Sequence, residues 1–184
     1  MGADGGSANL LFMPGGGSRC PPTPDSVSAR LHFLRMNGRE TYKSAVQAMY
    51  TAAREALRRC ELEISQIKCI IPHQANRRII DAVGQRLGAK PGQMFVNLER
   101  YGNTSAASVA IALDEAVAAG KIQRGDLVLM IVFGAGLHLP VLIHIQCSDQ
   151  TRQDQVRVGA GRVRQHDLRF DLVHLIALCL TLTG

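Results

Sequence analysis

Two stretches decide how this chain folds: Ile70-Ile71-Pro72-His73-Gln74-Ala75-Asn76-Arg77-Arg78 and Gly102-Asn103-Thr104-Ser105-Ala106-Ala107-Ser108. Each stretch comes at the end of an apolar run and leads into a segment with helical spacing. In α/β proteins, residues at such strand-to-helix corners meet at one edge of the sheet. We therefore expect His73 and Asn103 to serve one pocket as two hydrogen-bond donors.

The segments around these stretches alternate between helical and strand-like patterns. Helical periodicity is found in residues 37–60, Arg77–Leu87 and Thr104–Ala119. Short apolar runs, typical of buried strands, are found in residues 67–72, Gln93–Leu98 and Leu127–Phe133. This alternation predicts an α/β fold with a mostly parallel mixed sheet and helices on both faces.

The composition divides the chain into three parts. Residues 1–36 are rich in glycine and proline and read as loops, with a brief strand at Asn9–Met13. Residues 37–146 carry the α/β pattern. Residues 147–184 contain arginine but no lysine and have no clear period, so we expect a tail that is disordered or partly helical around Leu168–Leu180.

Charge and cysteine content exclude several classes of function. The net charge of +6 favours acidic partners or phosphates, but only 4% of the residues are aromatic, which argues against a nucleic-acid stacking platform. The five cysteines form no CxxC pair, so we expect neither a metal site nor a cofactor, and a reducing, cytoplasmic compartment. The apolar run Leu172–Leu182 is too short to span a membrane, and Met1 is not followed by a signal-like segment.

Each candidate residue also has an ordinary structural interpretation. His73 fits a buried turn as well as a ligand contact, and Asn103 is a favoured residue type for capping the helix that follows. Gly134-Ala135-Gly136 fits a tight turn as well as a backbone site close to a substrate. Arginines such as Arg77 and Arg78 fit a solvated helix face.

Taken together and in this order, the strings PHQAN, GNTSAAS and the glycine-rich turn resemble one family. They are similar to the C-terminal half of β-ketoacyl-acyl carrier protein synthase III, in the thiolase-like superfamily. The resemblance runs from Gly2 to Phe133 and weakens up to Ile145. It implies that residues 1–36 are a truncated N-terminal remainder, that residues 37–146 are the synthase C-terminal domain, and that residues 147–184 have no counterpart.

The resemblance also implies a chemistry. The family condenses a short acyl-CoA with malonyl-acyl carrier protein, with loss of carbon dioxide, and thereby starts fatty acid biosynthesis. His73 and Asn103 would hydrogen-bond the malonyl thioester oxygen as it gains negative charge. The donor nitrogen of His73 must then be protonated, with the other ring nitrogen expected to meet backbone.

Further site residues follow from the same resemblance. Gly134, Ala135 and Gly136 match an oxyanion loop, although the family usually has glycine where Ala135 stands. Contacts with acyl carrier protein and CoA are implied for a set of residues around the first motif: Arg39, Gln74, Ala75, Asn76, Arg77 and Arg78. The whole enzymes form homodimers, mainly through the half that this chain does not match.

One departure limits the expected activity. The nucleophilic cysteine of the family lies in the N-terminal half, at the start of a buried helix, and none of the five cysteines here has that context. We therefore expect this chain to be inactive in condensation when alone. Two alternatives stay open, namely a non-catalytic fragment that binds acyl carrier protein or CoA, and a similar condensing enzyme of another pathway.

Overall fold

The computed structural model of this chain describes residues 5–134, 141–145, 157–158 and 161–162. The helices are η1 (Gly5–Leu10), α1 (Pro24–Ser28), α2 (Gly38–Arg59), η2 (Ile64–Gln66), α3 (Arg77–Leu87), α4 (Leu98–Tyr101) and α5 (Ala107–Ala118). The strands are β1 (Leu11–Phe12), β2 (Arg35–Met36), β3 (Cys69–Pro72), β4 (Leu127–Ile131), β5 (Val141–Ile145), β6 (Arg157–Val158) and β7 (Gly161–Arg162). Apart from β6 and β7, the predicted tail at 147–184 lies outside the described residues.

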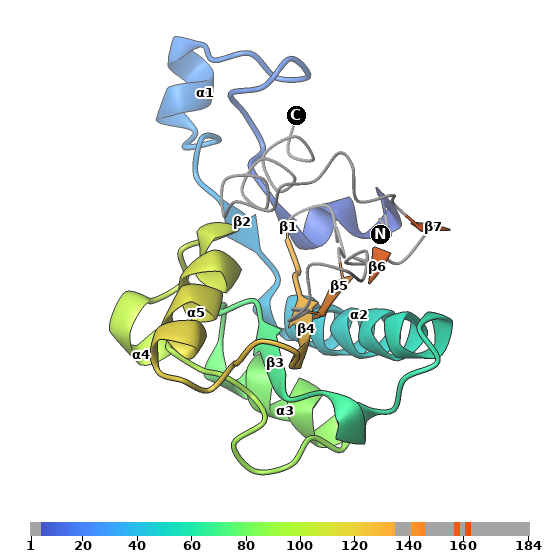
Figure 1. Cartoon of the computed structure of the whole chain (residues 1–184). Coiled ribbons are helices and arrows are strands. Elements are labelled where there is room, and N and C mark those ends of the chain that lie inside the picture. Colours follow the sequence, from blue (N-terminus) through green and yellow to red (C-terminus); the bar gives the residue numbers. More distant parts are fainter. Residues whose placement is uncertain (1–4, 135–140, 146–156, 159–160, 163–184) are drawn as a thin grey trace.

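The main sheet is mixed and has the order β3-β4-β5-β6-β7 (Figure 1). Strands β3 and β4 are parallel, with Ile70 opposite Leu129 and Pro72 opposite Ile131. The pairs from β4 onward are antiparallel, so within the described residues the sheet is mixed, but it is not mostly parallel as expected. A connection through α3, α4 and α5 joins the two parallel strands, as the helix–strand alternation predicted.

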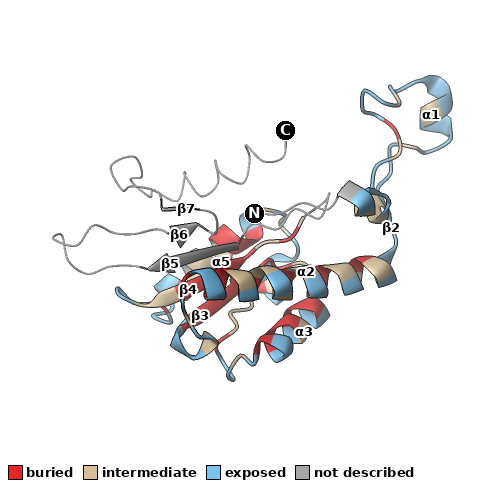
Figure 2. Ribbon diagram, turned by 90° about the vertical axis from the view of Figure 1, so that its right-hand side faces the viewer, coloured by how far each residue is buried: buried red, intermediate tan, exposed pale blue. Residues whose placement is uncertain are grey.

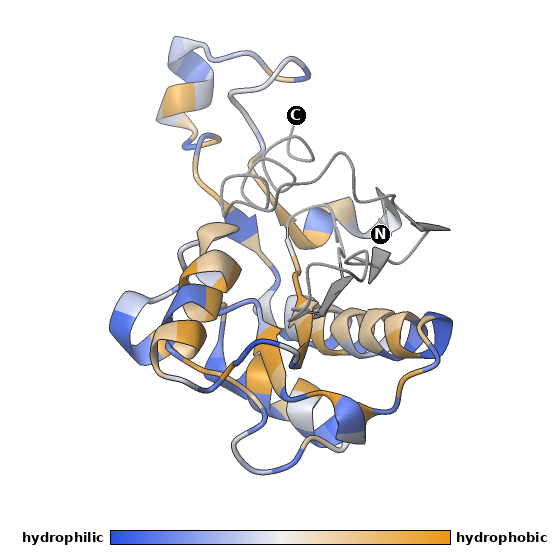
Figure 3. Ribbon diagram, viewed as in Figure 1, coloured by the Kyte–Doolittle hydropathy of each residue, from blue (hydrophilic) through white to orange (hydrophobic). Residues whose placement is uncertain are grey.

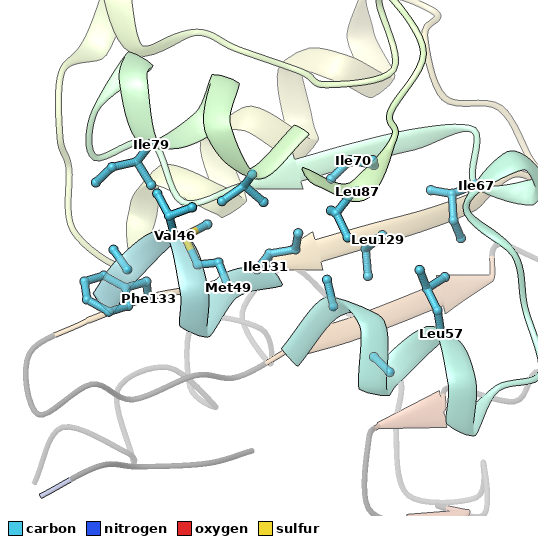
Figure 4. Packing of buried hydrophobic residues seen from close by; sticks show 14 of the residues in the cluster. Val46, Met49, Leu57, Ile67, Ile70, Ile79, Leu87, Leu129, Ile131 and Phe133 are labelled. Carbon is cyan, nitrogen blue, oxygen red and sulfur yellow. The ribbon is translucent and has the colours of Figure 1, made fainter. Parts of the chain in front are cut away.

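Helices cover both faces of the β3–β4 pair. On one face, α2 and α3 pack against Ile70, Leu129 and Ile131, and Figure 4 shows these side chains between the strands and α2. On the other face, α5 packs against a second set: Cys69, Ile71, Val128 and Met130. Because neighbouring strand residues point to opposite faces, two strands apolar along their whole length support two separate cores (Figures 2 and 3).

The two predicted helices on the first face occur almost where the periodicity placed them. Asn37 caps α2 by accepting a hydrogen bond from the Glu40 amide, and Asn76 caps α3 in the same way through the Arg78 amide. Gly88 ends α3 in a left-handed conformation, with φ of 71°. These local signals fix the ends of a helix without help from tertiary contacts, which explains the agreement.

The predicted strand Gln93–Leu98 is wrong for most of its length. Only one parallel bridge, between Ile70 and Met94, joins this segment to β3. Its backbone then leaves the sheet, because the Asn97 amide donates to the Gln74 side chain at 3.0 Å, and α4 begins at Leu98.

The third predicted helix begins later than expected, at Ala107 instead of Thr104. Ser105 has a φ of 55°, which no right-handed helix accommodates. Asn103 does not cap α5. Its side-chain oxygen accepts from the Ser105 amide at 3.1 Å and shapes the turn before the helix.

Residues between β1 and β2 project away from the body of the molecule (Figures 1 and 2). The two strands pair through Leu11 with Met36 and Phe12 with Arg35. The expected strand at Asn9–Met13 is thus confirmed for two residues. Large apolar side chains are exposed along this projection: Phe12, Met13, Val27, Phe33, Leu34 and Met36.

Candidate functional site

His73 stands immediately after β3 and is held by the sheet. Its backbone amide donates to the carbonyl of Ile131 at 2.7 Å, which extends the parallel ladder by one residue. The side chain is only 8% exposed. A rigid strand therefore positions a largely buried imidazole at the carboxyl edge of the sheet, where open α/β folds bind ligands.

The two sequence motifs meet through the His73 side chain. Its Nδ1 atom lies 2.7 Å from the Oγ atom of Ser108, the last residue of GNTSAAS and the second residue of α5. The expectation that this nitrogen meets backbone is therefore wrong. The Nε2 atom has no hydrogen-bond partner among the described residues, and it is not completely buried. It remains available to a ligand.

Burial also affects the charge of this imidazole. Loss of solvent around the ring lowers the pKa of His73 below its usual value. The ring is therefore neutral at neutral pH and offers one N–H donor and one acceptor.

Gln74 is part of the interior and not of a surface. It is 1% exposed, and its side-chain amide donates to the carbonyls of Pro72 and Phe95 while its oxygen accepts from the Asn97 amide. These contacts occupy the whole side chain. A direct contact of Gln74 with a carrier protein, implied by the resemblance, does not fit this position, whereas its neighbour Ala75 is half-buried beside the surface.

Asn103 lies in the exposed turn before α5. Its side-chain oxygen is bonded within the turn, so the NH₂ group is left to donate outward. The residue thus keeps the donor that the expected chemistry requires, on the same segment that carries Ser108.

The glycine-rich turn begins at the same edge of the sheet as His73. Gly134 follows β4, which is the parallel neighbour of β3. A Cβ atom at Gly134 would meet no atom within 4 Å among the described residues. Ala135 and Gly136, the other two predicted oxyanion-loop residues, lie outside the described residues.

A hollow of about 460 Å³ lies between the starts of α2 and α3. Its lining consists of Gly38, Arg39, Tyr42, Lys43, Asn76 and Arg78. Three of these residues were predicted contacts: Arg39, Asn76 and Arg78. Gly38, Tyr42 and Lys43 were missed, although their place in the first two turns of α2 after Asn37 could have indicated them.

The charges around the hollow are distributed unevenly. Arg78 extends into it and its guanidinium lies 5.7 Å from the centre of the Tyr42 ring. The neighbouring Arg77 points elsewhere and is bonded to Asp81 at 2.9 Å and Glu99 at 2.8 Å. Of the two adjacent arginines, only Arg78 thus offers its charge to a ligand in the hollow.

The described cysteines lack the context of a nucleophile. Cys20 is half-buried in a loop, Cys60 ends α2, and Cys69 lies within β3. Burial raises the pKa of Cys69 to about 11, so its thiol stays protonated at neutral pH. Within the described part of the chain there is no cluster of three metal-ligating side chains, and no helix long and apolar enough to cross a membrane.

Comparison with known proteins agrees with this arrangement. Residues 57–143 match the family described as 3-oxoacyl-[acyl-carrier-protein (ACP)] synthase III C terminal. Over 137 residues the chain is 50% identical to the β-ketoacyl-[acyl-carrier-protein] synthase III of Caldanaerobacter subterraneus subsp. tengcongensis, covering 74% of this chain and 41% of that relative. The chain thus spans about two fifths of the length of the curated relatives it matches.

Solved structures give the same result. The synthase III of Thermus thermophilus superimposes with a TM-score of 0.67 at 43% identity, over 80% of this chain and 44% of that one. The priming β-ketosynthase from the R1128 polyketide biosynthetic pathway superimposes with a TM-score of 0.67 at 37% identity, over 80% of this chain and 43% of that one.

His73 follows a buried strand and contacts Ser108 at the start of α5, on a mixed sheet that superimposes on a solved synthase III structure. The fold is therefore thiolase-like. Within that superfamily, residues 57–143 match the C-terminal domain of β-ketoacyl-acyl carrier protein synthase III, at 50% identity to one such enzyme over 137 residues. The family expected from the two motifs is thereby confirmed.

Proposed function

We propose that this chain is the C-terminal half of an acyltransferase that condenses an acyl-CoA with malonyl-acyl carrier protein and so initiates fatty acid biosynthesis. The observation that carries the proposal is the bond between His73 Nδ1 and Ser108 Oγ. It joins the two motifs and leaves Nε2 of His73 as the ring nitrogen available to substrate. We assign the protein to the cytoplasm, in line with its cysteine content.

The proposed chemistry is decarboxylation of a malonyl thioester. The bond between the carboxylate and the α-carbon breaks, carbon dioxide leaves, and the electron pair moves towards the thioester oxygen. His73 and Asn103 donate hydrogen bonds to that oxygen, and Gly134 begins the loop proposed to stabilise the acyl-enzyme oxyanion. Fixed donors in a water-poor site stabilise such charge without reorganising. The resulting carbanion attacks the carbonyl carbon of an acyl group held as a thioester on a cysteine outside the described residues. As the new carbon–carbon bond forms, the carbon–sulfur bond breaks and the cysteine leaves as a thiolate.

We propose that the hollow binds the phosphates of CoA and the acidic surface of acyl carrier protein. Arg39, Lys43 and Arg78 place cationic groups at its lining. The hollow also lies at the N-terminal ends of α2 and α3, where backbone amides favour negative charge. Ala75 and Asn76 connect it along the chain to His73, which suits a thioester reaching from the surface to the buried imidazole.

Release of carbon dioxide from malonyl-CoA tests this proposal. We expect the chain to accelerate the release and His73→Ala to reduce the rate about 10²- to 10³-fold, the usual effect of losing one oxyanion donor. His32→Ala is the matched control, because His32 is exposed on the projection between β1 and β2. Equal rates for the original chain and His73→Ala would contradict the proposal.

A second function, that of a non-catalytic module binding acyl carrier protein or CoA, is favoured by one observation. All the residues that line the hollow are distinct from His73 and Asn103. Binding that persists in His73→Ala, together with no carbon dioxide release by the original chain, would favour the module. A condensing role in another pathway is the other alternative, and the choice between acyl-CoA substrates would distinguish it.

A further inference from the structure

We propose that Ser108 is a positioning residue that fixes the tautomer of His73, with the ring proton on Nε2. The role of this tautomer in catalysis rests on the proposed function, because the malonyl oxygen would need a hydrogen-bond donor at Nε2. The tautomer itself is a property of the folded chain and can be measured without any substrate.

Ser108 and His73 are in contact in the interior of the protein. Ser108 is 2% exposed and His73 is 8% exposed, so water does not compete freely for their contact. The Oγ–Nδ1 distance of 2.7 Å is that of a short hydrogen bond. The two residues come from separate elements, the end of β3 and the first turn of α5. The contact therefore depends on the tertiary fold.

The hydrogen bonds at Ser108 Oγ decide which nitrogen of His73 carries the proton. The Gln74 backbone amide donates to the same Oγ atom at 3.2 Å and occupies one of its two acceptor positions. The hydroxyl proton then needs an acceptor, and among the described residues Nδ1 is the acceptor within reach. If Nδ1 instead donated, the hydroxyl proton would be buried without a partner, which is costly. A neutral imidazole whose Nδ1 accepts carries its proton on Nε2.

The backbone beside this contact is held in place by Gln74. The Gln74 side chain is bonded to the carbonyls of Pro72 and Phe95 and to the Asn97 amide. Its backbone amide thus stays aimed at Ser108. The orientation of the hydroxyl is set by a fixed donor on one side and by the imidazole on the other.

Nitrogen NMR of histidine-labelled full-length chain tests the inference, because two-bond correlations distinguish protonated from unprotonated ring nitrogens. Above the pKa of the ring we expect His73, assigned by comparison with His73→Gln, to carry its proton on Nε2. Ser108→Ala should shift the tautomer ratio towards Nδ1–H by about tenfold, the weight of one hydrogen bond. Ser108→Thr keeps a hydroxyl and should restore the original ratio.

Ser105→Ala is the matched control, since this serine lies in the same motif but is exposed. It should leave the ratio unchanged. A proton on Nδ1 in the original chain overturns the inference, and so does an unchanged ratio in a folded Ser108→Ala. Decarboxylation is measured separately: an Nε2–H tautomer without decarboxylation supports the inference and contradicts the proposed function.

Discussion

At the scale of single residues, burial gives His73 its chemical character. The fold removes water from the imidazole, which lowers its pKa and keeps it neutral, while Ser108 Oγ lies 2.7 Å from Nδ1. For the proposed decarboxylation, a neutral donor suits an oxygen that gains charge only as carbon dioxide leaves, since it does not attract the starting carboxylate as strongly as a cation would.

The lowered pKa of His73 predicts a pH dependence of stability. Between the folded-state pKa and the unfolded value of about 6.5, the unfolded chain binds a proton that the folded chain does not. The contribution is fully present above about pH 6.5 and is lost as the pH falls through that window, by at most about 1.4 kcal/mol per pH unit for one proton.

Urea unfolding across this range, in the original chain and in His73→Gln, measures the effect. The difference in unfolding free energy between the two should shrink as the pH falls, because the variant has no imidazole to protonate at this site. Parallel curves for the two chains would show that His73 takes up its proton equally in both states.

The adjacent arginines provide a second prediction at this scale. Arg78→Gln should weaken CoA binding about tenfold, because it removes a charge-assisted hydrogen bond from the hollow. Arg77→Gln changes the net charge equally but removes a side chain already bonded to Asp81 and Glu99, so its effect should stay below about threefold. Isothermal titration compares them, and equal losses would argue for a general charge effect.

At the scale of elements, Gln74 joins β3 to the segment that leads into α4. Its side-chain amide donates to two backbone carbonyls, and its side-chain oxygen accepts from one backbone amide. Gln74→Leu should lower the unfolding free energy by about 2–4 kcal/mol, because it leaves buried polar groups unpaired.

Gln123→Leu makes the same chemical change at an exposed position and should alter stability by less than about 0.5 kcal/mol. Chemical denaturation of both variants provides the comparison. A Gln74 variant as stable as the Gln123 variant would mean that this junction relaxes to pair its backbone groups elsewhere.

Sequence patterns located those elements whose ends are set locally. Asn76 and Gly88 bound α3 at the predicted residues, because a cap and a left-handed glycine act within one turn. The segment Gln93–Leu98 has a strand-like sequence, but its backbone follows Gln74, a partner that no local pattern reveals.

The same distinction applies to the candidate site. PHQAN and GNTSAAS identified His73 and Asn103 as residues of interest, yet the contact between His73 and Ser108 requires β3 and α5 to be packed on one sheet. The sequence motif contained Ser108 without indicating that it would face the histidine. Arg77 and Arg78 were likewise equivalent in sequence, and only their neighbours in space separate them.

At the scale of the whole molecule, the chain matches about two fifths of the length of its relatives. Its described part combines a covered core with an exposed apolar projection. Helices α2, α3 and α5 cover both faces of β3 and β4, which gives this part its own core. The projection between β1 and β2 instead exposes several large apolar side chains. Such a surface is typical of a segment that packs against further protein.

We expect no condensation by the chain alone. Purified chain incubated with acetyl-CoA and malonyl-acyl carrier protein should give no β-ketoacyl product by mass spectrometry. In the proposed mechanism His73 and Asn103 act on the malonyl thioester, whereas none of the described cysteines stands at the start of a buried helix as the family's nucleophile does. Cys20 lies in a loop, Cys60 is buried at the end of α2, and the thiol of Cys69 has a pKa of about 11.

A chimera provides the matched experiment, in which residues 5–134 replace the corresponding segment of the Caldanaerobacter synthase. It retains that relative's remaining residues, so we expect it to form product and to lose about 10²- to 10³-fold in rate on His73→Ala. Product from the isolated chain would show that it contains its own acyl acceptor. A folded chimera that forms no product would show that this half does not perform the proposed step.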